Sequence, residues 1–205
     1  MRRDNVQSGV LSRESTFRDS EDHIVATEKI VYAGPHAGTA LTDYQLANQQ
    51  SHINIRVQRI EPPAEKNKKT LPTYEVVVKK ADGSQTSESF PIRENLILPP
   101  QLLDQLTAHL IDWEQKQDWE FNLLVPDLQM TVTMKVSVAE TTTETLRLKL
   151  RPAYWAIAAF VSPLYFNLDR KTKLVTRAEG QTLLLGADGK PFVARTEFRL
   201  PSPKP

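Results

Sequence analysis

The amino-acid sequence predicts a mainly β fold, in which a strongly curved antiparallel sheet or open barrel packs on one amphipathic helix at about residues 100–116. Apolar and polar residues alternate along much of the chain, which is the period that strands with one buried face require. Two Asp-Gly pairs, at 82–83 and 188–189, are typical of tight hairpin turns. Only one segment shows strong helical spacing, so we expect one main helix among about ten strands.

The N-terminal part begins with a polar stretch and continues as two expected strands. Residues 1–20 show no regular alternation, which predicts a loose arm. Over 24–32, apolar residues recur at positions of one parity, as they do in a half-buried strand. A turn that contains glycine and proline follows, and residues 41–47 are expected to form the partner strand.

The clearest alternation comes next. Residues 53–57 alternate strictly between isoleucine or valine and a polar side chain, which predicts a strand with one buried face. The charged stretch 61–69 is interpreted as a solvated connection. Strands are then expected over 74–80 and 84–90, joined by the first Asp-Gly turn.

One segment breaks the strand period. Pro99 and Pro100 are tolerated in the first turn of a helix, because the amide hydrogens there lack partners within the helix. Apolar residues follow at helical spacing and form a stripe: Leu102, Leu103, Leu106, Leu110, Ile111 and Trp113. The opposite side is polar, so this helix is expected to cover the apolar face of the sheet.

The second half returns to strands and closes the predicted domain. Alternating segments lie over 119–125, 130–138, 146–151, 164–168, 174–185 and 192–199. Residues 153–161 are apolar all round, which predicts a buried short helix or strand. We therefore expect a single β domain over 21–200, with an extended tail at 201–205.

Composition excludes several classes of function. The formal net charge of +1 lacks the basic excess of a nucleic-acid binder. The absence of cysteine excludes thiolate metal sites, disulfides and a cysteine nucleophile. No apolar run is long enough for a membrane helix, and Arg2-Arg3 is followed by no apolar segment of a secretion signal.

No motif for catalysis, metal binding or a cofactor stands out. The four histidines form no paired ligand motif, and the seven glycines form neither a phosphate-binding loop nor a dinucleotide fingerprint. A serine nucleophile elbow is also lacking. We therefore predict no catalytic residue, no metal and no cofactor.

Several turns carry a family resemblance. The stretch 164–175, Glu179-Gly180, the 188–191 turn and the Leu124-Val125-Pro126 turn together resemble the C-terminal part of a family of bacterial exported proteins of unknown function. The resemblance covers roughly residues 24–200. It implies an open β-barrel similar to the lipoprotein-localisation factors, a place in the cell envelope or periplasm, and an apolar ligand. The absence of a signal sequence departs from that pattern and leaves a cytoplasmic location open.

Three functional hypotheses follow. The first is a non-enzymatic binding protein that holds an apolar or lipid-like small molecule between the curved sheet and the helix. Its contacts would be aromatic residues: Trp113, Trp119, Phe121, Tyr154, Trp155 and Phe160. For the 154–161 segment, plain core packing is the stronger alternative. The second is a structural or protein-interaction module with a filled core, and the third is an enzyme with an unfamiliar site.

Overall fold

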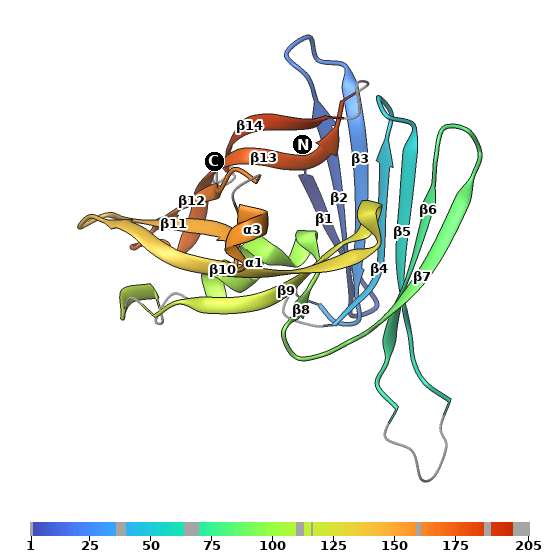
Figure 1. Cartoon of the computed structure of the whole chain (residues 1–205), viewed down its shortest axis with the longest axis horizontal. Coiled ribbons are helices and arrows are strands. Elements are labelled where there is room, and N and C mark those ends of the chain that lie inside the picture. The colour runs from blue at the N-terminus through green and yellow to red at the C-terminus, as the bar shows by residue number, and fades with distance from the viewer. Residues whose placement is uncertain are drawn as a thin grey trace. The chain divides into compact units, whose positions relative to one another are not determined.

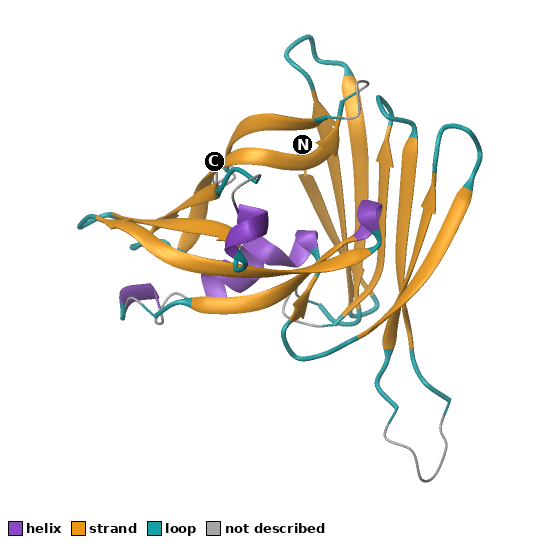
Figure 2. Cartoon of the chain, in the orientation of Figure 1, coloured by secondary structure: helices purple, strands orange, loops and turns teal. Residues whose placement is uncertain are grey.

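A computed structural model describes residues 2–35, 40–63, 70–109, 113–115, 117–158, 161–186 and 190–198. Most of these residues belong to β-strands, with only short helical segments between them (Figure 2). The strands form two sheets of seven, and neither sheet closes on itself within the described residues. The predicted mainly β class is confirmed, although its strands are divided between two sheets.

The first sheet is a meander in which each strand pairs antiparallel with the next one along the chain (Figure 1). Its strands are β1 (Arg2–Gln7), β2 (Val10–Arg18), β3 (Ile24–Tyr32), β4 (Leu41–Asn48), β5 (Ile53–Ile60), β6 (Thr73–Lys79) and β7 (Gln85–Pro91). This order leaves β1 and β7 at the two edges of the sheet.

The N-terminal residues are not a loose arm, so the prediction for 1–20 is wrong over residues 2–18. These residues form the hairpin of β1 and β2, with Gln7 opposite Val10. Ser8 and Gly9 make the turn with φ angles of 52° and 76°. Two consecutive residues with positive φ are what a tight type I′ hairpin turn requires.

One face of the first sheet is apolar and buried. Inward-facing residues of β2 to β6 meet there in a continuous core: Leu11, Ala26, Ile30, Tyr32, Leu41, Tyr44, Leu46, Ile55, Val57, Tyr74, Val76 and Val78, with Leu98 and Leu124. A register shift between Val31 and Tyr32 brings Leu41 to the same face as Tyr44 although the two differ in parity. The predicted inward face of 53–57 is confirmed, since Ile55 and Val57 are both buried. A short 3-10 helix, η2 (Pro126–Leu128), contacts β5 and β6, and the side-chain amide of Gln129 donates from Nε2 to the carbonyl of Val76 at 3.0 Å.

The second sheet has the order β14-β13-β12-β11-β10-β9-β8. Its strands are β8 (Leu96–Ile97), β9 (Trp119–Val125), β10 (Met130–Thr141), β11 (Thr145–Pro152), β12 (Leu164–Asp169), β13 (Leu174–Leu185) and β14 (Pro191–Glu197). The apolar parity predicted for 146–150 is confirmed, because Leu146, Leu148 and Leu150 are buried.

The predicted helix begins where expected but is shorter. A 3-10 turn, η1 (Pro99–Gln101), leads into α1 (Leu102–Ala108), which buries Leu102 and Leu106. Residues 110–112 and 116 of the predicted helix lie outside the described residues. A second short helix, α3 (Trp155–Ala158), contacts β11.

The chain divides into two compact units. The first comprises residues 1–100, 124–131 and 184–190, and the second comprises 101–123, 132–183 and 191–205. Compactness alone does not show that a unit folds independently, so the single domain expected over 21–200 stays a prediction. The second Asp-Gly turn and the 201–205 tail lie outside the described residues.

Gly180 of β13 offers a test of local packing in the second unit. Its φ is +129°, and a Cβ added there would lie 3.0 Å from both the Leu164 Cδ2 atom and the Pro163 carbonyl oxygen. Gly180→Ala should therefore lower the free energy of unfolding by roughly 1–3 kcal/mol, as a midpoint shift in urea denaturation would show.

Gly83→Ala is the matched control. Gly83 also has a positive φ, +81°, but an added Cβ there meets no atom within 4 Å. The Gly83→Ala variant therefore has a strained backbone but no steric clash of the new Cβ, and its free energy of unfolding should fall less than that of Gly180→Ala. Equal losses in the two variants would contradict the packing described at Gly180.

Candidate functional site

Three of the aromatic residues predicted from the sequence come together in the second unit. The Trp119 ring stacks on Phe121 at 4.4 Å between centroids, and Trp113 lies 6.1 Å from Trp119. His109 joins them by stacking on Trp119 at 4.3 Å. Trp113 and Phe121 are buried, and the Trp113 indole donates to the Leu106 carbonyl at 2.9 Å. The Trp113 side chain is thereby bound to α1.

Two other predicted aromatic residues, Tyr154 and Trp155, are exposed. The sequence predicts a buried short helix or strand over 153–161. A short helix is present, but Tyr154 and Trp155 are 63% and 83% exposed, so the prediction of burial is wrong for both. Apolar composition was a misleading signal here, because exposed single aromatics are common on protein surfaces. Phe160 lies outside the described residues.

A charged cluster that was not predicted from the sequence lies on the apolar face of the first sheet. Strand alternation places Arg13 on the same face as Leu11, and Glu28 on the same face as Ile30. In the β1–β2 ladder, Asp4 stands directly opposite Arg13. Arg2 and Asp4 have the same parity on β1, so both share the face of Arg13.

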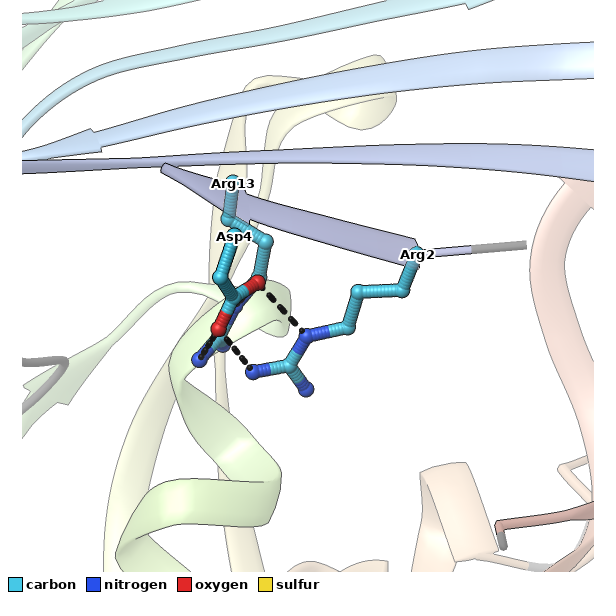
Figure 3. Close-up of polar contacts among 3 residues, drawn as sticks. All are labelled: Arg2, Asp4 and Arg13. Carbon is cyan, nitrogen blue, oxygen red and sulfur yellow. Dashed lines mark hydrogen bonds and ion pairs between the residues drawn. The ribbon is translucent and has the colours of Figure 1, made fainter. Parts of the chain in front are cut away.

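The guanidinium groups of Arg2 and Arg13 both form hydrogen bonds with the Asp4 carboxylate (Figure 3). Arg2 donates from Nε and Nη2 to the two Asp4 oxygens at 3.1 and 3.2 Å, and Arg13 donates from the same atoms at 3.2 and 3.5 Å. The Arg13 side chain is only 8% exposed, whereas the side chains of Arg2 and Asp4 are 47% and 42% exposed. The Arg13 guanidinium also lies 5.8 Å from the centroid of the Tyr32 ring.

The pKa values of the two carboxyl groups on β1 and β3, Asp4 and Glu28, are shifted in opposite directions. Burial opposes ionisation of Asp4, but the hydrogen bonds and charges of Arg2 and Arg13 outweigh it and lower its pKa. At Glu28 the balance is reversed. Burial raises the pKa of Glu28, although Ser15, Tyr44 and both arginines favour its charged form.

Tyr44 and Asp127 extend the cluster across the apolar face. Burial raises the pKa of the Tyr44 hydroxyl well above its usual value, helped by the nearby charges of Glu28 and Asp127 and by a hydrogen bond to Glu28. Burial also raises the pKa of Asp127, which lies in η2. The cluster therefore holds two permanent cations, one carboxylate kept charged, and two carboxyl groups that take up protons more readily than usual.

This arrangement can bind an anion and can exchange a proton at Glu28. Among the described residues, no group of three histidine or acidic side chains is placed to hold a metal ion. None of the described helices is long and apolar enough to cross a lipid bilayer.

The signal for this site in the sequence was weak. Leu11, Arg13, Ser15 and Phe17 do have one parity, but two of the four are polar, so the segment does not show the hydrophobic alternation of a strand. An inward-facing arginine and an inward-facing glutamate become recognisable only when the strand register is known.

Comparison with known proteins adds no relative: no protein-family model, no curated protein and no solved structure matches this chain. The resemblance to an exported family with an open barrel therefore stays a prediction.

The raised pKa of Glu28 predicts a pH dependence of stability. Between the ordinary value of 4.5 and the raised pKa, the folded chain binds more protons than the unfolded chain. Glu28 thus contributes stability that is fully present below pH 4.5 and is lost as the pH rises through its raised pKa. Glu28→Gln should remove this part of the loss, so its melting temperature should fall less than that of the wild type as the pH rises from 4.5.

The matched control is Glu14→Gln, because Glu14 lies on the opposite, solvent-facing side of the same sheet. Thermal melts of the three proteins at several pH values would provide the comparison. Parallel curves for wild type and Glu28→Gln would contradict the burial of an ionisable group at this position.

Proposed function

We propose that this chain is a non-enzymatic binding protein, and that the charged cluster on the first sheet holds the anionic head group of an amphipathic ligand. The observation that carries the proposal is the placement of Arg13, a nearly buried guanidinium, on the core-facing side of the sheet beside Arg2 and Asp4. An arginine fork recognises carboxylate, sulfonate or phosphate groups through paired hydrogen bonds.

Arg2 supplies the donors that a ligand can reach. Of the five N–H donors of a guanidinium, the contacts to Asp4 occupy two. The side chain is about half exposed, so its remaining donors are accessible to an anion from solvent. A ligand head group would then lie against Arg2 and share the positive field of Arg13.

Apolar side chains next to the cluster suit the tail of such a ligand. Val6 of β1 has the parity of Asp4 and is 55% exposed, and its partner across the ladder is Leu11. Phe17 is partly buried and packs against the same core. A charged group flanked by apolar surface is the pattern that an amphipathic molecule requires.

The sequence-based hypothesis placed an apolar ligand between the sheet and the helix, with aromatic contacts. The charged cluster is better supported by the described residues, because it combines accessible donors with neighbouring apolar surface. A location in the cell envelope, as the family resemblance implies, is part of this proposal, and fractionation of the host cell would test it.

Substitution of Arg2 should weaken binding of an amphipathic anion. We expect Arg2→Gln to raise the Kd for monomeric decanesulfonate by roughly 10- to 100-fold, since a hydrogen bond to a charged group contributes about 1.5–3 kcal/mol. Isothermal titration below the micellar concentration would measure the change. Decanol, which lacks the charge, should bind wild type and variant alike.

Arg3→Gln is the matched control, because Arg3 is the neighbouring arginine and points to the other face of β1. It should bind decanesulfonate like the wild type.

The affinity of the wild type for decanesulfonate should also increase as the pH falls toward the raised pKa of Glu28, since protonation removes a negative charge near both arginines. The proposal fails if decanesulfonate does not bind, or if Arg2→Gln and Arg3→Gln behave alike.

A protein-interaction module is the second candidate, and the exposed pair Tyr154 and Trp155 favours it. Tyrosine and tryptophan are enriched in the binding hot spots of protein interfaces. If this pair mediates self-association, sedimentation equilibrium should show a mass that rises with concentration, and Trp155→Ser should abolish the rise. Val193→Ser, at a position that is also 83% exposed, should leave it unchanged. A wild type that stays monomeric at all concentrations would contradict self-association.

A further inference from the structure

The solvent-facing side of the first sheet is hollowed. An open depression of about 540 Å³ runs across strands β2 to β7 on the face opposite the charged cluster. Most of its lining comes from two adjacent rows of side chains that follow the cross-strand register. Four residues that lie between these rows along their strands also line it: Ser15, Glu28, Leu46 and Ile55. We call this depression the cross-strand trough.

The register defines the two rows. One row contains Glu14, Lys29, Gln45, Arg56 and Val77, and the other contains Thr16, Thr27, Ala47, Asn54, Lys79 and Gln85. Five strand spacings of about 4.8 Å give the trough a length of roughly 24 Å. Small side chains near its middle, at Thr27 and Ala47, leave room for an extended ligand.

The lining is polar and rich in groups that both donate and accept hydrogen bonds. Side-chain amides of Gln45, Asn54 and Gln85 have this dual capacity, as do the threonine hydroxyls, although the Gln45 amide already donates to Asp43 at 2.7 Å. Within the described part of the chain, the side chains of Asn54, Gln85 and Lys79 make no ion pair and no hydrogen bond to another side chain. They are therefore available to a ligand.

Two of the three cations of the trough are paired with carboxylates. Lys29 pairs with Glu14 at 3.7 Å, and Arg56 pairs with Asp43 at 3.0 Å. Lys79 makes no ion pair among the described residues, and it lies between Asn54 and Gln85 in its row. A ligand with many hydroxyl groups and an occasional carboxylate matches this lining.

From this complementarity we infer that the cross-strand trough binds an acidic oligosaccharide, with sugar hydroxyls on the amide and threonine side chains and a uronate carboxylate on Lys79. A nucleic acid fits less well. One unpaired lysine offers little charge to a phosphate backbone, and the lining contains no aromatic ring on which a base could stack.

Titration with tetragalacturonate tests the inference. Wild-type protein should bind it, and its fully methyl-esterified form should bind more weakly because the carboxylates are lost. Lys79→Gln should raise the Kd for tetragalacturonate by about tenfold. Ala47→Phe should abolish binding by filling the floor of the trough, and an aromatic side chain is well tolerated on a strand surface.

Two controls make the result specific. Gln58→Ala changes a neighbouring polar residue of β5 that does not line the trough, and it should bind tetragalacturonate like the wild type. Arg2→Gln alters the charged cluster on the other face and should also leave this binding unchanged. The two proposals therefore fail independently. Thermal melts would confirm that every variant remains folded.

Three results would overturn the inference. The first is no binding of tetragalacturonate at about 10 mM. The second is wild-type affinity in Ala47→Phe, because the trough would then not be the site. The third is equal or tighter binding of a short single-stranded DNA that is weakened by the same substitutions, because the trough would then belong to a nucleic-acid binder.

Discussion

The first unit depends on the alternation of side chains along an antiparallel meander, which register shifts interrupt once between β2 and β3 and once between β3 and β4. Because every strand pairs with the next one along the chain, the register of these pairs fixes both faces of the sheet. A slip of one residue in any strand would exchange its buried and exposed side chains. The apolar core, the charged cluster and the cross-strand trough are thus three results of one pairing pattern.

Within that pattern, Arg13 is the residue whose placement is most demanding. A buried charge without a partner costs several kcal/mol, whereas a well-paired charge can be accommodated. Its ion-pair partner, Asp4, comes from the edge strand β1, whose side chains are all exposed and add little apolar burial. The attachment of β1 and the burial of Arg13 therefore support each other.

The sequence predicted those parts of the fold in which alternation is purely hydrophobic. Val57 and Leu148 lie in such segments, and both are buried as expected. Residues 2–18 escaped prediction because inward positions there carry Asp4 and Arg13, so polarity no longer reports which face is buried. The charged cluster could not be predicted at all, since residues from β1, β2, β3, β4 and η2 meet only once the register exists. Apolar composition in turn misled the prediction at Trp155, where the side chain faces solvent.

The hairpin of β1 and β2 has a consequence for how the chain behaves at high concentration. An open edge strand offers unpaired amide and carbonyl groups to any other extended chain, and this is a common route to aggregation. Here the edge strand carries Arg2, Arg3 and Asp4 within three successive positions. The side chains of an added strand would lie next to these charges. Only a strand with complementary charges could pair there without electrostatic repulsion. The edge is thereby protected against indiscriminate sheet extension.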